Sequence, residues 1–148
     1  MRTLLIALAF LLAAPAGAHA APKDEALKVV EQWSQAFTNS DVDAIVGLYA
    51  PDALFLGTSS KTVVTDPAGV RAYFENGLLN NRPRGAKLNS FEVMTVSDTV
   101  VVVTGLDTIT GVRDGAPTIA NGRVTFVVAK RGGAWKIVHF HRSAVPGG

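Results

Sequence analysis

Cysteine is absent from this sequence of 148 residues, and its absence removes several kinds of chemistry. A chain without cysteine forms no disulfides, offers no thiolate ligands to a metal and has no thiol nucleophile. A lipid-modified cysteine behind a leader segment is excluded as well. The fold must therefore depend on one packed core, which a chain of this length can build.

Net charge is the second scarce feature, since 14 Lys and Arg residues stand against 12 Asp and Glu residues. One of the basic residues, Arg2, lies in the N-terminal leader, and without it 13 basic residues face 12 acidic ones. A surface that binds nucleic acid needs a basic excess to neutralise phosphates. We therefore expect no nucleic-acid partner.

The leader itself, MRTLLIALAFLLAAPAGAHA, has the three parts of a secretory signal peptide. Arg2 supplies the positive charge, residues 4–14 form the apolar run, and Ala18-His19-Ala20 is a small-x-small cleavage site. The run is shorter than the ~20 residues that a membrane helix needs. We therefore predict a signal peptide over residues 1–20, one domain over residues 21–148 without a membrane span, and a periplasmic or secreted location.

Helices are predicted in the first half of the chain. Apolar residues recur at helical spacing over residues 24–38. A short second helix is expected from a cap at Ser40 to a stop at Pro51. A third should begin at Asp66-Pro67, where a capping residue precedes a proline at the first helical position.

Strands are predicted in the second half, over residues 86–96, 99–111, 117–130 and 134–143. The connections have tight-turn chemistry, at Ser97-Asp98, Asp114-Gly115 and Gly132-Gly133. Residues 53–57 and 61–64 add a small separate hairpin. The expected fold class is α+β, with about three N-terminal helices packed on a curved antiparallel sheet of four long strands.

The second face of this sheet needs a partner of its own. Residues 100–103 read VVVV, which is apolar on both faces, whereas a sheet with one solvated face should alternate. Three helices cover only one face. We therefore expect a homodimer or a larger homo-oligomer, formed most simply about a two-fold axis.

Histidines mark the last strand, in the segment WKIVHFHRSAVPGG. His139 and His141 are two residues apart and should point to the same side, while Arg142 points to the other. Zinc needs three or four ligands, and the third histidine, His19, leaves with the leader. We expect no metal site, and we expect the two histidines to form hydrogen bonds at a sheet or subunit interface.

The turn at Gly132-Gly133 predicts a register in which Arg123 lies opposite Arg142. Two like charges directly opposite one another destabilise a strand pair unless both reach water or an anion lies between them. A carboxylate suits the guanidinium fork. A β-bulge in this pair would break the prediction.

Asp107 is the carboxylate that could serve as a base. With Asp114-Gly115 as the turn, Asp107 lies opposite Gly122 and Leu106 lies opposite Arg123. Asp107 should then lie on the face away from the arginines.

Three segments, WSQAFTNSDVDAIVGLYAPDALF, RAYFENGLL and GRVTFVVAKRGGAWKIVHFHRSAVP, resemble the nuclear transport factor 2-like superfamily. More narrowly, they resemble the association (hub) domain of calcium/calmodulin-dependent protein kinase II and its stand-alone bacterial relatives, which are also called SnoaL-like. Residues 73–76 (YFEN) and 137–143 (IVHFHRS) look like the hub's own segments. The resemblance covers essentially the whole chain behind the leader.

The resemblance implies a cone-shaped α+β barrel in which a curved sheet wraps a long helix. It also implies a pocket at the wide end and a dimer through the outer face of the sheet. In the kinase hub the arginine of the His-Phe-His-Arg-Ser motif lines a deep pocket that accepts small carboxylates, and this role carries over to Arg142. The hub's arginine on the preceding strand matches Arg123 only with a gap.

Enzymes also use this fold. The ketosteroid isomerases combine a general-base aspartate with a tyrosine and a protonated aspartic acid. Aligned through LYAPDA, that tyrosine falls on Trp33, the base on Gly57 and the second aspartic acid near Arg123. Gly57 cannot take a proton, so steroid isomerase chemistry is not expected, and the histidine–aspartate pair of the polyketide cyclases has no secure match.

Two functions remain open. The first is a binding and assembly module whose pocket holds a small molecule, such as a carboxylate or another anionic metabolite. The pocket residues would be Arg142, Arg123, Trp33, Tyr49 and Tyr73, with Phe55 and Phe74 interpreted as core. The alternative is a SnoaL-like enzyme, an isomerase, cyclase or hydrolase, with Asp107, His139 and His141 as the candidate catalytic residues. Neither function implies a cofactor.

Overall fold

The structure, a computed structural model, describes residues 20–146. The predicted signal peptide, apart from Ala20, lies outside the described residues. Three helices precede or flank the first strand, and they are α1 (Pro22–Asn39), α2 (Val42–Gly47) and α3 (Pro67–Leu78). Five strands form one sheet, and they are β1 (Tyr49–Leu56), β2 (Gly85–Ser97), β3 (Val100–Arg113), β4 (Ala116–Arg131) and β5 (Ala134–Ala144).

Capping chemistry sets where the helices begin, and one predicted cap is wrong. Ser40 has φ 54° and closes the C-terminal end of α1. The neighbouring Asp41 caps α2 by accepting a hydrogen bond from the Ala44 amide at 2.9 Å. Asp66 caps α3 as expected, accepting from the Gly69 amide at 2.9 Å. The predicted stop at Pro51 is also wrong, because α2 ends before β1 begins.

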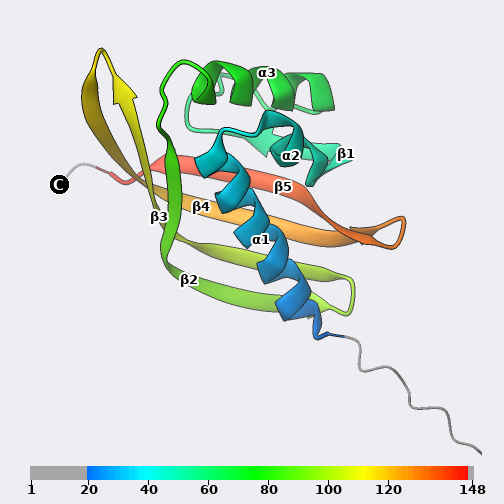
Figure 1. Ribbon diagram of the computed structural model, residues 1–148. Helices are drawn as coiled ribbons and strands as arrows, with labels where there is room; N and C mark the ends of the chain where they lie inside the picture. The colour runs from blue at the N-terminus through cyan, green and yellow to red at the C-terminus, as the bar shows by residue number, and fades with distance from the viewer. Residues whose placement is uncertain (1–19, 147–148) are drawn as a thin grey trace, which may run out of the picture.

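The fold class is confirmed as α+β, and the four long strands are where the sequence placed them. The sheet has the order β1-β5-β4-β3-β2, and β1 runs parallel to β5 while the other neighbours are antiparallel. The predicted short hairpin forms only in part. Phe55 and Val64 make an antiparallel bridge with two backbone hydrogen bonds, but residues 53–57 belong largely to β1 and residues 61–63 form no strand. The sheet is therefore mixed, has five strands, and is an open cone wall rather than a closed barrel (Figure 1).

Helix α1 lies along the concave face of the sheet (Figure 1). The core lies between them, and Trp33 is at its centre. The Trp33 ring centroid lies 5.3 Å from those of Phe37 and Phe126 and 5.4 Å from that of Phe140. Phe55 stacks on Phe140 and is fully buried, which agrees with its interpretation as core. The helix is thus fixed against the sheet by aromatic contacts from two strands, β4 and β5.

A β-bulge changes the predicted register of the last hairpin. Pairing follows the expected register from Arg131–Ala134 to Val128–Ile137, and then shifts so that Val127 pairs with His139. The extra residue on β5 moves every later partner by one position. Arg123 therefore lies opposite Ser143, and Val124 lies opposite Arg142, so the predicted arginine–arginine pair is wrong.

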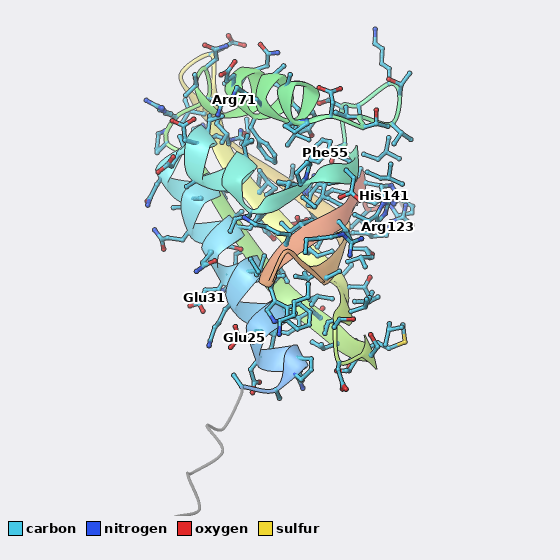
Figure 2. The ribbon with its side chains drawn as sticks, turned by 90° about the vertical axis from the view of Figure 1, so that its right-hand side faces the viewer. Glu25, Glu31, Phe55, Arg71, Arg123 and His141 are labelled. Atoms are coloured by element: carbon cyan, nitrogen blue, oxygen red, sulfur yellow. The ribbon has the colours of Figure 1, made fainter. Side chains whose placement is uncertain are left out.

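The face of the sheet turned away from α1, here called the outer face, carries both histidines as predicted. His139 is half-buried and His141 is exposed, while the intervening Phe140 is buried. Figure 2 shows His141 and Arg123 projecting from this same side. The face is partly apolar, since Met94 pairs with Val102 and is 59% exposed. Across residues 20–146, no helix combines the length and the hydropathy that crossing a membrane would take.

Candidate ligand-binding site

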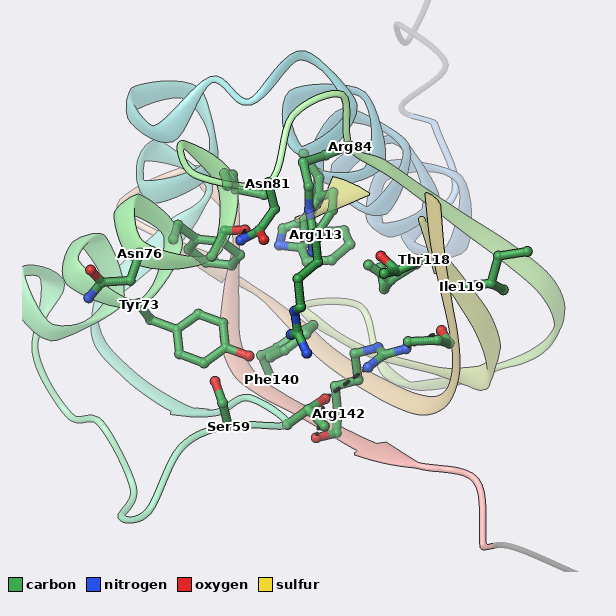
Figure 3. A pocket seen from close by; sticks show the side chains of 18 residues that line it. Ser59, Tyr73, Asn76, Asn81, Arg84, Arg113, Thr118, Ile119, Phe140 and Arg142 are labelled. Carbon is green, nitrogen blue, oxygen red and sulfur yellow. Dashed lines mark hydrogen bonds between the residues drawn. The ribbon is translucent and has the colours of Figure 1, made fainter. Parts of the chain in front are cut away.

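A cavity of about 790 Å³ opens between the helices and the strand ends nearest α3. It is here called the arginine cavity. Its wall comes from α1, α3, β3, β4, β5 and the segments that follow β1 and precede β2. Figure 3 shows that the polar side chains enter from several elements that are far apart in sequence. The fold thus brings together groups that no single motif contains.

The floor of the arginine cavity is aromatic. It is formed by Trp33, Phe37, Phe74 and Phe140. The single N–H of the Trp33 indole is already used, because Nε1 donates to the Tyr49 hydroxyl at 3.0 Å. Trp33 therefore offers a ligand its ring surface and no hydrogen bond.

Tyr49 was predicted as a pocket residue, and the structure places it behind the cavity wall. It is buried and is not one of the lining residues. Burial raises the pKa of its hydroxyl well above the usual value, with the Trp33 hydrogen bond acting in the opposite direction. Its contact with the cavity is indirect, through the orientation of Trp33.

Arg142 lines the arginine cavity, and its charge is already balanced by a buried partner. Its Nε lies 2.7 Å and 3.0 Å from the two carboxylate oxygens of Asp107. Its Nη1 donates to Thr58 Oγ1 and its Nη2 to the Ala120 carbonyl, each at 2.9 Å. The ion pair is closed to solvent, with side-chain exposures of 9% for Arg142 and 1% for Asp107. Arg142 is therefore held in one geometry by three other segments of the chain.

Asp107 was expected on the face away from the arginines, and this is wrong for Arg142. The predicted pairing of Asp107 with Gly122 is confirmed. The bulge in β5, however, turns Arg142 to the same side as Asp107. Gly122 leaves the room that the pair occupies, since a Cβ there would collide with Arg142 Nη2 and Asp107 Oδ1.

Arg123 does not share the cavity with Arg142. It lies exposed on the outer face, where its Nε donates to Ser143 Oγ at 3.2 Å. His139 and His141 lie on the same face. Burial lowers the pKa of His139, and the neighbouring His141 lowers it further. These residues are therefore placed to meet another surface rather than a ligand in the cavity.

Two arginines that the sequence analysis did not select, Arg84 and Arg113, complete the cavity. Arg84 precedes β2, and its guanidinium lies 5.3 Å from the centroid of the Phe37 ring. Arg113 is the last residue of β3, at the rim. Within residues 20–146 neither has a carboxylate oxygen within 4.0 Å.

The protonated form of Arg84 is destabilised by its surroundings. Burial lowers its pKa most, the Tyr73 hydroxyl raises it, and the charges of Arg113 and Arg142 lower it. These influences require the four groups to be near one another. An anion bound among these groups would stabilise the protonated form of Arg84, because it would supply the opposite charge that this form lacks.

Hydroxyl-bearing side chains also line the cavity, and they belong to Thr58, Ser59, Tyr73 and Thr118. The Tyr73 ring packs on Phe55 at 4.7 Å, and a Cβ on Gly57 would collide with its hydroxyl. Figure 3 shows the Tyr73 and Ser59 hydroxyls turned into the space that the arginines also face. The predicted pocket position of Tyr73 therefore agrees with the cavity, and Gly57 is the residue that makes room for it.

Metal ligation finds no candidate in the part of the chain that the structure describes. Among residues 20–146 there is no cluster of three or more His, Asp or Glu side chains placed to hold an ion.

Comparison with known proteins identifies relatives over nearly the whole domain. A sequence profile described as "SnoaL-like domain" matches residues 26–147. The subunit delta of calcium/calmodulin-dependent protein kinase type II from Oryctolagus cuniculus is 31% identical over 130 residues, which is 85% of this chain. The chain spans only 24% of that curated relative.

Solved structures show the same fold. A candidate calcium/calmodulin-dependent protein kinase II association domain from Xanthomonas campestris superposes with a TM-score of 0.77 at 29% identity, covering 96% of this chain and 99% of its own. A nuclear transport factor 2-like superfamily protein from Salmonella enterica gives 0.76 at 19% identity, covering 85% and 92% of the two chains. The second likeness concerns the fold alone.

Proposed function

This chain belongs to the SnoaL-like domain family, and on that premise we propose that it is a binding and assembly module whose arginine cavity holds a small anionic molecule, such as a carboxylate. The observation that carries this proposal is the pair Arg84 and Arg113, two guanidinium groups without a carboxylate partner within residues 20–146, above an aromatic floor. A guanidinium fork matches the two oxygens of a carboxylate.

Arg142 forms part of the cavity wall, but its charge is already neutralised by Asp107. Its donors already bind Asp107, Thr58 and Ala120. It therefore contributes a fixed wall, and we assign the direct contacts with the anion to Arg84 and Arg113. This assignment differs from the role that the family resemblance gives to the motif arginine alone.

A catalytic role for the three candidate residues has less support. None of the described residues that line the arginine cavity is an Asp, a Glu or a His. Asp107 lies behind Arg142 in an ion pair, and His139 and His141 lie on the outer face. Proton transfer needs a group within hydrogen-bond reach of the substrate, so these observations favour binding.

Substituting either free arginine should weaken the binding of a carboxylate. We expect Arg84→Ala and Arg113→Ala each to lower the affinity for phenylacetate about tenfold or more, because each removes a charge-assisted hydrogen bond. Fluorescence of Trp33 reports binding if Trp135, which does not line this cavity, is replaced by Phe. Arg123→Ala on the outer face is the matched control. If the wild type binds and both variants bind equally well, the proposed site is incorrect.

Assembly is the second part of the proposal. The solved relative from Xanthomonas campestris is described as an association domain, and the outer face here exposes Met94 and Leu106. We propose that a second copy of this chain covers that face, giving a homodimer or a larger homo-oligomer. Apolar sheet faces of this kind usually mark protein contacts.

A charge on the outer face should separate the subunits. We expect Leu106→Arg to raise the dissociation constant about tenfold or more, because it places like charges across the two-fold contact in place of apolar area. Sedimentation velocity and native mass spectrometry measure the outcome. Leu79→Arg, at the end of α3 and 46% exposed like Leu106, is the control. A wild-type protein that is monomeric at micromolar concentration would overturn the proposal.

Export is the third part, and it depends on the sequence of residues 1–20. We propose that the leader is removed and that a single domain of residues 21–148 acts in the periplasm or outside the cell. Expressed in full in a bacterial host, the processed protein should begin at Ala21, and Ala18→Arg should leave the leader attached, because the cleavage site needs small residues. N-terminal sequencing of the protein from each cell fraction shows whether the leader has been removed. Wild-type protein that stays in the cytoplasm with an intact leader would contradict export.

A further inference from the structure

The balance of charge around the arginine cavity goes beyond what a simple monoanion requires. Three arginines line the cavity, and Asp107 neutralises one of them. The two that remain, Arg84 and Arg113, lie just before β2 and at the end of β3. Since no described acidic side chain pairs with either, the residues that line the cavity carry an excess of two positive charges.

Arg84 has a buried hydrogen-bond donor, its Nε, without an acceptor among the described residues. Leaving a charged buried donor unsatisfied is costly, and such groups in native proteins usually mark a site for a ligand, an ion or water. The charges of Arg113 and Arg142 lie near Arg84 and also favour a bound anion, because an anion between like charges reduces their repulsion.

The donors around the cavity come from four separate segments of the chain. Arg84 precedes β2 and Arg113 ends β3, while the hydroxyls of Tyr73 and Ser59 come from α3 and from the segment after β1 (Figure 3). A carboxylate has two coplanar oxygens and is satisfied by a single guanidinium fork. A tetrahedral group with three terminal oxygens can accept from several directions at once.

The cavity is also larger and more apolar than a short-chain acid requires. Its volume of about 790 Å³ is in the upper part of the range for sites that bind whole small molecules. The floor of Trp33, Phe37, Phe74 and Phe140 presents ring faces and edges. A ligand that fills the cavity would therefore add a ring-sized apolar body to its charged end.

We propose that the arginine cavity selects an amphipathic dianion, with a phosphate monoester group held between Arg84 and Arg113 and an apolar, ring-sized body on the aromatic floor. This inference rests on the proposed function, since it names the class of anion for that same cavity. A phosphate monoester carries a charge close to −2 at neutral pH and three acceptor oxygens. These properties match the two guanidinium groups without an acidic partner among the described residues, together with the additional hydroxyl donors.

The test compares two ligands of the same shape that differ by one charge. Phenyl phosphate and phenyl sulfate are titrated into the Trp135→Phe protein, with phenylacetate as the carboxylate probe and inorganic phosphate as the probe without a ring. At pH 7.5 we expect phenyl phosphate to bind about tenfold or more tightly than phenyl sulfate, because only the phosphate carries a second charge. Inorganic phosphate should bind more weakly than phenyl phosphate, because it lacks the ring.

Acidification supplies a second readout. The phosphate loses its second charge near pH 6, whereas the sulfate does not titrate. The ionisable side chains at the cavity are Arg84, Arg113, Arg142 and Tyr73, with Asp107 behind them, and no histidine is among the lining residues. We therefore expect the affinity for phenyl phosphate to fall between pH 7.5 and pH 5, while the affinity for phenyl sulfate stays constant. The preference for phenyl phosphate should then largely disappear.

Variants assign the second charge to particular residues. Arg84→Ala and Arg113→Ala should each reduce the phosphate-to-sulfate preference, while Arg123→Ala on the outer face should leave it unchanged. Arg84→Lys keeps the charge without the fork, so it tests the geometry if Arg84→Ala lowers the melting temperature. Preference that persists in both alanine variants would overturn the assignment to these arginines.

The remaining outcomes separate this inference from the function on which it rests. Equal affinities for phenyl phosphate, phenyl sulfate and phenylacetate would overturn the selection of a dianion and leave an anion-binding cavity. No binding of any of the three by a folded wild-type protein would overturn both.

Discussion

Asp107→Asn is expected to lower the free energy of unfolding by about 3–5 kcal/mol, because it leaves the buried Arg142 without its counter-charge. The carboxylate accepts twice from Arg142 Nε, and both side chains are closed to solvent. The variant keeps the size of the side chain, so the loss measures charge rather than volume. Urea denaturation followed by far-ultraviolet circular dichroism gives the value.

The control for this prediction is an exposed ion pair in the same protein. Asp52 lies 3.9 Å from Arg131, and its side chain is 70% exposed. Solvent screens this pair, so Asp52→Asn should change stability by less than about 1 kcal/mol. The double variant Asp107→Leu with Arg142→Met should recover part of the loss, since apolar side chains often replace a buried pair without cost. Equal stability of Asp107→Asn and wild type would contradict the buried pair.

Trp33→Ala is expected to lower the free energy of unfolding by about 3–5 kcal/mol, because it empties the centre of the aromatic core. Trp33 is 1% exposed, and rings of α1, α3, β4 and β5 pack around it. The substitution also removes part of the cavity floor. Affinity for phenylacetate should therefore fall together with stability, as measured by calorimetry and denaturation.

A second pair of variants separates packing from hydrogen bonding at this position. Tyr49→Phe removes the acceptor of the Trp33 Nε1–H and leaves that donor buried, at an expected cost of about 1–3 kcal/mol. Trp33→Phe loses the donor and some volume. If the hydrogen bond matters, the double variant will lose less stability than the sum of the single ones. Strict additivity would show that the indole contributes by packing alone.

Sequence patterns predicted the parts of this fold that depend on local chemistry. Asp114-Gly115 and Gly132-Gly133 take positive φ angles, from 50° to 86°, and they form the two-residue turns expected of such residues. These turns fix the neighbouring register, which is why Arg131 faces Ala134 and Asp107 faces Gly122 as predicted. Side alternation likewise placed His139 and His141 together on the outer face.

The missed features arise where register changes within a strand. The bulge next to Val128 follows no local signal, and its extra residue on β5 turns Arg142 to the face of Asp107. Arg123 keeps its predicted partner Leu106 and lies with it on the outer face. Arg84 and Arg113 were missed for a related reason. The turn between β2 and β3 lies at Asp98-Thr99 and not at the predicted Ser97-Asp98. The pairing of β2 with β3 also shifts twice, so no register counted from the turn reaches Arg84 and Arg113 correctly.

The position of β5 within the sheet has a consequence for when the protein can fold. β5 is the last strand in the sequence, yet it lies between β1 and β4. Until it emerges from the ribosome, β1 has no neighbour in the sheet and Arg142 cannot reach Asp107. The sheet therefore stays incomplete through most of the synthesis of the chain. Contacts between residues so far apart in the sequence also form slowly. This topology therefore delays folding until nearly all of the domain has been made.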